Sequence, residues 1–343
     1  MITHFVLGQK GDASPSSRYR LGPLIEVLPA PHTLVDVPPV FGSSHANELL
    51  AAGSRDRALV LQRVLPERGV VPELRAAYGS IVFDYDDALY AAPPNARGSR
   101  AEELVRAARR LALRGSPTAS GRRRELVALL RSVDLCVAGN PVLRDFAAGL
   151  DAPTVVIPTT IEPVAEDPDR PEEPTVVWLG LPGSLRYLDG IRGALRAVHA
   201  RTPFRLRIVC SAPWPDERLR PEFVRWSESA SRAALLTATV GIAPLADTPW
   251  TRGKCASRCI QYGAHALAAV ASPVGVTPEV VVHERTGWLA SSPAEWVERL
   301  TAALRDPGRT HALGLAARDR VADRFSPEVA RRMWRAALET LAH

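Results

Sequence analysis

Short apolar runs alternate with longer amphipathic stretches along the chain. The runs have the length of buried strands, whereas the amphipathic stretches repeat their apolar positions about every three to four residues, as helices do. Strands are predicted at Ile2–Leu7, Ala58–Leu61, Ser80–Phe83, Leu135–Ala138, Thr154–Ile157, Thr175–Leu179, Arg205–Cys210, Val240–Ala243 and Ala268–Ala271. Helices are predicted at Ser99–Leu113, Arg122–Arg131, Leu185–Ala200, Arg258–Leu267 and Pro293–Arg305. This alternation favours parallel sheets with crossover helices, and therefore an α/β chain.

The alternation restarts after Glu162–Pro174, a segment whose prolines and acidic residues suit an exposed hinge. We therefore predict a Rossmann-like domain over 1–162, a linker over 163–174 and a second Rossmann-like domain over 175–325. Residues 326–343 predict an amphipathic helix with Ser326 as its N-cap and Pro327 at its first position. Packing of this helix back on the first domain is left open. Open α/β sheets bind ligands at the carboxyl ends of their strands, so we expect a ligand cleft between the halves.

The composition argues against several classes of protein. The chain of 343 residues has 46% hydrophobic and 23% charged residues, which excludes wholesale disorder. Lys and Arg exceed Asp and Glu by 43 to 37 with no long basic block, so a phosphate-rich small ligand accounts for the net charge of +6 as well as a nucleic acid does. With 6% aromatic residues, we expect no dedicated nucleic-acid surface.

The cysteines and the first residues of the chain indicate where in the cell the protein is located. Four cysteines in a chain of this length do not make a disulfide framework, and no His or Cys pair near Cys255 and Cys259 completes a zinc site. The first residues suit a strand rather than a signal peptide, and no apolar run approaches the roughly 18 residues that a membrane helix needs. We expect reduced thiols and a cytoplasmic location. Peripheral membrane contact and the oligomeric state are left open.

The most informative segment for chemistry is Val240–Ala264. It predicts a strand, a polar loop and a helix that begins near Ala256. Loop amides and a helix N-terminus form an anion site, to which Lys254 and Arg258 add positive charge. Gln261 follows one turn later, where its amide would reach a hydroxyl beside the anion. The segment therefore indicates either a site for a nucleoside diphosphate and its ribose or a solvated basic helix start.

A second segment, Ala268–Ala290, predicts a strand, a Gly/Pro loop, a short helix holding Glu279 and a hairpin-like turn at Thr286-Gly287. Together the two segments resemble the retaining GT-B glycosyltransferases of family 4, in a bacterial branch of the group 1 glycosyl transferases. The motifs that carry the resemblance are Gly253-Lys-Cys, Gln261-Tyr, Val270-Ala-Ser-Pro-Val-Gly-Val, Glu279-Val-Val and Gly287-Trp-Leu-Ala. The resemblance is most specific over 237–325, and weaker at Ser16–Arg20, Val82–Tyr90 and Val156–Glu162.

The resemblance implies two Rossmann-like domains that face each other. It implies an NDP-sugar donor, of the UDP or GDP type, bound mostly by the C-terminal domain. The acceptor, bound mostly by the N-terminal domain, would offer a hydroxyl of a small molecule, a natural product or a saccharide. Transfer would retain the anomeric configuration. No cofactor is required and the protein usually holds no metal, although Mg²⁺ is left open.

Carried over residue by residue, the resemblance also shows departures. Gln261 takes the place of the second acidic residue of the family's E-x7-E pattern, which holds the ribose hydroxyls. Gly253 stands where the first acidic residue usually is, so that role is absent or moved, with Asp247 as the candidate. Arg258 replaces the branch's Lys. The family's Gly and Pro after this helix are Ala266 and Ala268 here.

Departure of a diphosphate dianion needs fixed cations, which lower the barrier to breaking the glycosyl–phosphate bond. The candidates are Arg186, Lys254 and Arg258, although Arg186 also suits a surface position at a helix start. Retention of this type needs no protein nucleophile, because the acceptor hydroxyl attacks from the leaving-group face and gives its proton to the phosphate. We therefore expect no carboxylate pair at glycosidase spacing. Further candidate donor contacts are Gly180, Gly183, Ser184, Gly253, Cys255, Ala256 and Ser257.

An acidic cluster follows the predicted strand Ser80–Phe83. Asp84, Asp86 and Asp87 therefore lie at the carboxyl edge of the sheet, where they would orient acceptor hydroxyls or attract a cationic acceptor. Closely spaced carboxylates also suit Mg²⁺ or Mn²⁺, and acidic residues also cap helices. The three interpretations stay open at this point.

Other candidates come from single residues near predicted strand ends. Arg18 and Arg20 would reach the donor phosphates or an acidic acceptor. The alternative is that both are ordinary surface charges. Arg63 follows the strand Ala58–Leu61 and is a weaker candidate for the same role. The residues expected at the nucleobase are Val224, Arg225 and Trp226, with a core position as the alternative for Trp226. The residues expected at the sugar pocket are Trp250 and Thr251.

Two further function classes remain beside the transferase. A nucleotide-sugar epimerase on the same fold would need an acid/base set and no acceptor. A catalytically silent relative that acts as a binding protein would tolerate the departures at Gly253, Ala266 and Ala268.

Overall fold

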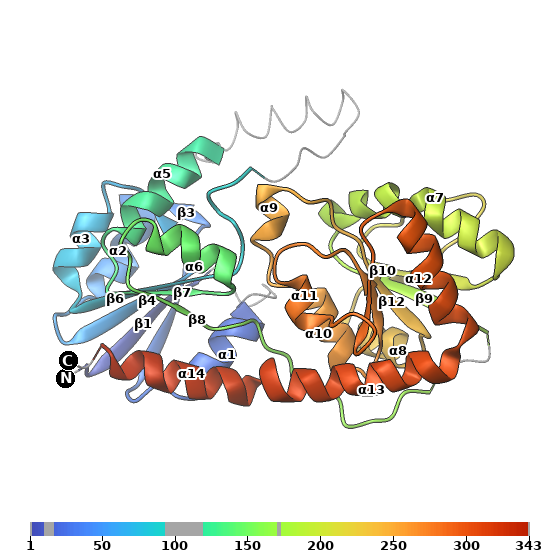
Figure 1. The fold of residues 1–343 in the computed structure, drawn as a ribbon. Helices are drawn as coiled ribbons and strands as arrows, with labels where there is room; N and C mark the ends of the chain where they lie inside the picture. The colour runs from blue at the N-terminus through green and yellow to red at the C-terminus, as the bar shows by residue number, and fades with distance from the viewer. Residues whose placement is uncertain (1, 10–16, 93–118, 170–172, 342–343) are drawn as a thin grey trace. The chain divides into compact units, whose positions relative to one another are not determined.

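The computed structural model describes residues 2–9, 17–92, 119–169 and 173–341. It divides the chain into two compact units, which are described separately (Figure 1). The first unit comprises the described residues of Met1–Thr159, Gly253–Cys255 and Pro327–His343. The second unit comprises those of Thr160–Arg252 and Ala256–Ser326.

The first unit is built on a six-stranded parallel sheet. Its strands, in spatial order, are β2 (His32–Asp36), β1 (His4–Gln9), β4 (Arg57–Gln62), β6 (Ser80–Tyr85), β7 (Leu135–Ala138) and β8 (Thr154–Val156). A separate short ladder joins β3 (Val40–Phe41) to β5 (Leu65–Pro66). The helices are η1 (Ser17–Leu21), α1 (Gly22–Ile25), α2 (Ser43–Ala51), α3 (Val71–Ala77), α5 (Ala119–Leu130), α6 (Pro141–Ala148) and α14 (Pro327–Glu339).

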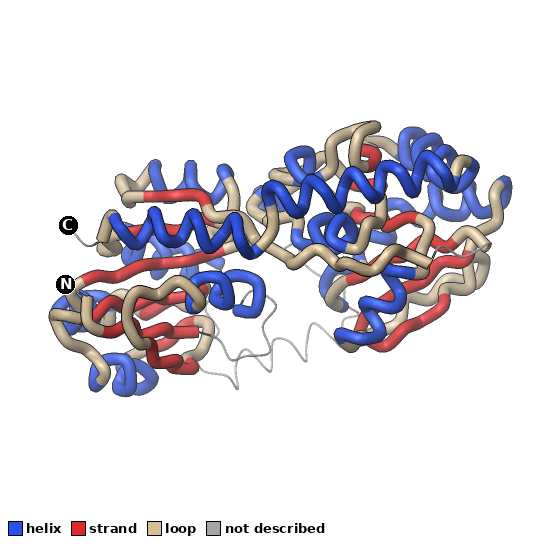
Figure 2. Tube along the Cα trace, turned by 90° about the horizontal axis from the view of Figure 1, so that it is seen from below, coloured by secondary structure: helices blue, strands red, loops and turns tan. Residues whose placement is uncertain are grey.

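The C-terminal helix α14 belongs to the core of the first unit, along one face of its sheet (Figures 1 and 2). Trp334 is fully buried and packs in one cluster with Phe5, Val60 and Val82 of the central strands. Helices on a face of a parallel sheet explain why these strands are almost continuous apolar runs. Helix α14 begins at Pro327, as predicted, and the hydroxyl of the preceding Ser326 donates back to the carbonyl of Ala322.

The second unit has its own six-stranded parallel sheet. In spatial order the strands are β11 (Glu222–Arg225), β10 (Arg205–Cys210), β9 (Thr175–Leu179), β12 (Val240–Ala243), β13 (Ala269–Ala271) and β14 (Gly287–Leu289). The helices are η2 (Pro182–Ser184), α7 (Arg186–Arg201), α8 (Glu228–Leu236), α9 (Pro249–Arg252), α10 (Ser257–Ala264), α11 (Thr277–Val280), α12 (Pro293–Arg305) and α13 (Pro307–Arg324). The chain begins this sheet in the middle, extends it to one edge, and then returns to build the other side. This is the strand order of a Rossmann fold.

The core of the second unit lies between its sheet and the helices α7 and α12. Trp178, Trp288 and Trp296 are buried in one apolar cluster with residues of both helices. The α12 helix begins with a complete capping box, in which the hydroxyl of Ser292 accepts from the backbone N–H of Glu295 and the Glu295 carboxylate accepts from that of Ser292. These reciprocal bonds fix the first turn of the helix.

All nine predicted strands are present, with ends shifted by a residue or two. The structure differs from the prediction at two places. The expected turn at Gly287 instead starts β14, parallel to β13. The expected exposed linker contains Val164, which is buried and donates a backbone hydrogen bond to the carbonyl of Ala264 in the second unit. The predicted helix Ser99–Leu113 lies outside the described residues.

No helix among the described residues has both the length and the apolar character that a bilayer span requires.

Candidate functional site

The carboxyl ends of β9 and β12 mark the point in the second unit where the strand order reverses. The chain leaves β9 through Gly180 and η2, and it leaves β12 through the loop that leads to α9. Open α/β sheets bind ligands just outside such a reversal point. The candidate site of the second unit is therefore this edge, at the start of α10.

Helix α10 begins at Ser257, as the sequence indicates. Its N-cap, Ala256, has a left-handed backbone (φ 51°, ψ 26°), and no side chain caps the helix. Cys259 and Tyr262 are buried on one face, whereas Ser257 is exposed and Gln261 is half-buried. Because backbone N–H groups of a first turn have no partner within the helix, they are suited to hold an anion.

Arg258 is held at the end of β9 by two contacts. Its Nε donates to the carbonyl of Leu179, and its guanidinium carbon lies 4.8 Å from the ring centroid of Trp178. Gly180 permits this placement, since a Cβ there would lie 2.7 Å from an Nη atom of Arg258. The Arg258 guanidinium is therefore fixed beside the start of α10.

Arg186 is the first residue of α7, immediately after the loop that follows β9. Its Nε donates to the carbonyl of Gly183, at 2.7 Å. Gly183 and Ser184 lie in the short helix η2, which leads into α7. The structure thus places Arg186 at a helix start, with its guanidinium turned toward the backbone of the preceding loop.

The loop after β12 and helix α9 contain Asp247, Trp250 and Thr251, the residues expected near the donor. Thr251 is fully buried, and its hydroxyl bonds within the loop to Thr248 and Ala246. The assignment of Thr251 to an open sugar pocket is therefore corrected, because its side chain holds α9 together. Asp247 is exposed and pairs with Arg252, whose hydrogen bond lowers the pKa of that carboxyl. Trp250 is half-buried.

The residues expected at the nucleobase form the edge strand β11 and its end. Val224 and Arg225 lie in β11, and Trp226 follows it with its backbone N–H donating to the carbonyl of Cys210. Trp226 is 49% exposed and Phe223 is 44% exposed. The core alternative for Trp226 is therefore wrong, and the edge offers two accessible aromatic rings.

In the first unit, Arg20 and Asp84 form a buried ion pair. Nε and Nη2 of Arg20 donate to the Asp84 carboxylate, and Nη1 donates to the carbonyl of Ile157, at 3.0 Å. Burial alone would lower the pKa of Arg20, but the Asp84 carboxylate outweighs it and the pKa is raised. The assignments of Arg20 to phosphates and of Asp84 to acceptor hydroxyls are corrected, because each side chain is buried against the other. Arg18 is exposed.

Asp86 and Asp87 form a charged cluster with Arg63, which follows β4 with a positive φ of 57°. The Nζ of Lys254 lies 3.2 Å from Asp87 Oδ1. The short segment Gly253–Cys255 thus packs into the first unit, and a Cβ at Gly253 would lie 2.5 Å from that of Ala88. The position has no room for an acidic side chain.

Cys255 and Asn140 complete this cluster. The Cys255 thiol donates to the carbonyl of Asp86, at 3.3 Å, and burial raises its pKa to about 12, so the thiol is neutral. Asn140 caps α6 and donates through Nδ2 to the carbonyl of Gly253, at 2.9 Å. The sequence analysis missed Asn140, although Asn before Pro141 is a standard helix-start signal.

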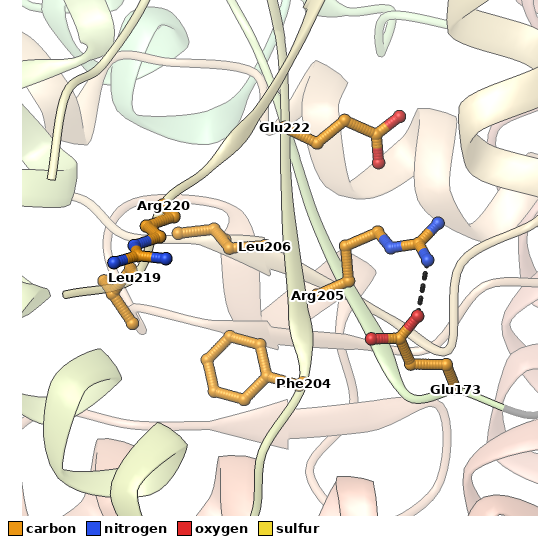
Figure 3. Close-up of a pocket in the computed structure, with 7 residues that line it drawn as sticks. All are labelled: Glu173, Phe204, Arg205, Leu206, Leu219, Arg220 and Glu222. Carbon is orange, nitrogen blue, oxygen red and sulfur yellow. Dashed lines mark hydrogen bonds and ion pairs between the residues drawn. The ribbon is translucent and has the colours of Figure 1, made fainter. Parts of the chain in front are cut away.

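Neither unit shows a metal centre in the part of the chain that the structure describes: no three His, Cys, Asp or Glu side chains there are grouped to hold an ion. A cavity of about 380 Å³ lies elsewhere in the second unit (Figure 3). It is lined by Glu173, Phe204, Arg205, Leu206, Leu219, Arg220 and Glu222. Arg205 begins β10 and Glu222 begins β11, so this cavity lies at the amino ends of the strands. Arg258 lies at their carboxyl ends, on the opposite edge of the sheet.

No family model matches the chain, and no curated protein matches it in sequence. Solved structures do match. HepE of Anabaena, solved with UDP and glucose, has 13% identity and a TM-score of 0.62, over 99% of this chain and 100% of that one. Sucrose-phosphate synthase from Thermosynechococcus elongatus has 18% identity and a TM-score of 0.57, over 99% of each chain.

TarM of S. aureus has 9% identity and a TM-score of 0.61, over 87% of this chain, which spans 57% of the TarM chain. These neighbours are GT-B glycosyltransferases. The chain has the GT-B fold. The predicted fold class is confirmed, and at these identities the likeness establishes the fold alone.

Proposed function

We propose that the protein is a glycosyltransferase that moves a sugar from an NDP-sugar to an acceptor hydroxyl with retention of the anomeric configuration. The observation that carries this proposal is Arg258, a guanidinium fixed at the strand reversal of the second unit beside an uncapped helix start. A cation and helix amides at one point suit a diphosphate.

The donor would be held by the second unit. Its diphosphate would lie at the start of α10 against Arg258, with Arg186 as a second cation from the start of α7. Gln261, one turn along α10, would bond the ribose, and Trp226 at the end of β11 would stack on the base. A UDP or GDP donor fits this arrangement, and HepE has been solved with UDP-glucose.

The proposed reaction needs no nucleophile from the protein. The glycosyl–phosphate bond breaks, the diphosphate leaves as a dianion, and the acceptor hydroxyl attacks from the same face and gives its proton to a phosphate oxygen. Arg258 stabilises the negative charge that develops on the departing diphosphate. We propose no protein-held metal and no cofactor, and the charge on the leaving group is met by arginines and amides.

The acceptor would be held by the first unit, within the predicted domain 1–162. Asp86 and Asp87 stand at the carboxyl end of β6, where they would orient acceptor hydroxyls. Lys254 is held by Asp87, so a role for Lys254 at the diphosphate requires exchange of that carboxylate for phosphate. A cytoplasmic location is part of the same proposal, since all four cysteines are free thiols.

The test starts with a panel of UDP-, GDP- and ADP-sugars screened by thermal shift. A bound donor at a hundredfold excess over its Kd stabilises the fold by about 2.7 kcal/mol, which is easily measured. NDP release that rises with added acceptor, and an unchanged anomeric coupling constant in the product, support the proposal. An isomerised donor without NDP release would indicate an epimerase. Binding without turnover would indicate a silent binding protein, and no shift with any nucleotide overturns the proposal.

A further inference from the structure

One side of the end of β9 pairs with β10, through Trp178 and Leu179, whereas the side toward β12 is held by helix α10. β9 pairs with β12 at two positions, Val176 with Val240 and Val177 with Gly241. At Leu179, two residues further on, the backbone N–H donates to the hydroxyl of Tyr262 and the carbonyl accepts from Arg258 Nε. Two side chains of α10, four residues apart and therefore on one helix face, take the place of a strand.

The hydroxyl of Tyr262 bridges the two strands where they separate. It accepts from Leu179 N at 3.1 Å and donates to Ile242 O at 3.0 Å, so it serves β9 and β12 at once. Its ring lies against the backbone of Gly241, where a Cβ would come within 2.6 Å of a ring carbon. Tyr262 is fully buried, so no water replaces these bonds if the hydroxyl is lost.

The orientation of Arg258 depends on the same strand end. Its hydrogen-bond acceptor is the carbonyl of Leu179, and its stacking partner is the preceding residue, Trp178. Both partners belong to the last two residues of β9. Any displacement of this strand end moves the carbonyl and the ring that fix the guanidinium.

We propose that Tyr262 is a positioning residue for Arg258: by joining Leu179 to Ile242, its hydroxyl fixes the strand end that orients the guanidinium. The consequence for catalysis rests on the proposed function, in which Arg258 meets the departing diphosphate. Arg258 is then pre-organised before the donor binds, and no reorganisation is required as charge develops.

The geometric part is tested without any substrate. In protein with ¹⁵N-labelled arginine, the Arg258 Hε signal is identified by its loss in Arg258→Lys, and its exchange with solvent is measured. In Tyr262→Phe we expect this exchange to accelerate at least tenfold. The matched control is Tyr78→Phe, which removes another buried tyrosine hydroxyl, bonded to the carbonyl of Leu49 in the first unit. It should leave the Arg258 signal unchanged, and equal exchange in wild type and Tyr262→Phe would overturn the proposal.

Hydrogen exchange of the wild type gives a second reading that does not depend on the folding of a variant. If the Tyr262 hydroxyl couples the two groups, the Leu179 amide and the Arg258 Hε open together. Their protection factors then agree within about threefold and fall in parallel as denaturant is added. Protection factors that differ by more than tenfold, or that respond differently to denaturant, contradict the coupling.

Kinetics then separate this inference from the proposed function. With an active donor and acceptor, Tyr262→Phe should lower kcat about tenfold with KM for the donor within threefold. In the Arg258→Ala protein the same substitution should have no further effect on kcat, because its effect passes through Arg258. An equal loss in both proteins overturns the positioning role and leaves the transferase standing. A wild type without turnover overturns the transferase, while the exchange experiments still decide the geometry.

Discussion

The ammonium of Lys254 lies 3.2 Å from Oδ1 of Asp87, so the lysine that the sequence assigns to a diphosphate is held by a carboxylate in the first unit. The same carboxylate also pairs with Arg63. Lys254 therefore meets phosphate only by giving up this ion pair, and Asp87 keeps Arg63 as a partner when it does.

Substitution of Lys254 tests its role at the diphosphate. We expect Lys254→Ala to raise the Kd for the nucleoside diphosphate about tenfold, or about 1.4 kcal/mol, with the fold retained because Arg63 still neutralises Asp87. Isothermal titration of the diphosphate gives the Kd. An unchanged Kd would confine Lys254 to its ion pair with Asp87.

Substitution of Arg258 should lower the rate of the proposed reaction far more than substitution of a similar surface arginine. We expect Arg258→Ala to lower kcat/KM by about a hundredfold or more, because one preorganised donor to a developing anion has an effect of that order. Arg205→Ala is the control, since Arg205 is paired with Glu173 at the opposite sheet edge. Similar steady-state constants for the two variants would remove Arg258 from the mechanism.

Asp216 makes the second unit sensitive to acid. Burial would raise the pKa of Asp216, but the backbone N–H of Leu219 together with Arg196 and Arg192 outweighs burial and lowers it below its ordinary value of 3.8. A carboxyl with a lowered folded pKa stabilises the fold above its unfolded pKa, and this contribution is lost as pH falls through the folded pKa.

Asp216→Asn should therefore destabilise the protein by about 2–3 kcal/mol at pH 7, and the difference from wild type should shrink as pH falls below about 4. Urea unfolding at pH 7, 5 and 3 measures both effects. The control Asp145→Asn removes an exposed pair with Arg144 and should change stability by less than about 0.5 kcal/mol. A pH-independent difference would contradict the assigned charge.

Loss of the capping box of α12 should lower the stability of the fold by less than loss of the Asp216 charge. Ser292→Ala removes the side-chain acceptor for the backbone N–H of Glu295 and should cost about 1 kcal/mol. Ser291→Ala changes an adjacent serine outside the box and serves as the control. Thermal unfolding of both variants is the measurement, and equal midpoints would show that the box contributes nothing.

The sequence predicted the central strands because parallel strands buried on both faces are continuous apolar runs, as at Ser80–Phe83. It missed three edge strands that lack such runs: β2 and β11 are largely exposed, and β14 begins with a glycine that suits a turn. It also took Glu162–Pro174 for a fully exposed linker, because prolines and charges conceal the burial of Val164.

The candidate site could be predicted where the signal is local. The start of α10 and the place of Arg258 follow from one continuous segment, in which strand, loop and helix are neighbours in sequence. The Arg20–Asp84 pair could not be predicted, because the two residues are 64 positions apart and charged residues are ordinarily exposed. The role of Tyr262 was missed because its hydroxyl bridges β9 and β12, two strands that are far apart in the sequence and separate at this point.

The crowding of Gly253 against Ala88 limits which side chains this position accepts. A glutamate at position 253 would first push apart the two backbones that meet there, so its carboxylate would lie on a displaced segment that also carries Lys254 and Cys255. A larger side chain at this position needs compensating space on the β6 side. An acidic residue at position 253 therefore requires a second substitution, at Ala88 or beside it.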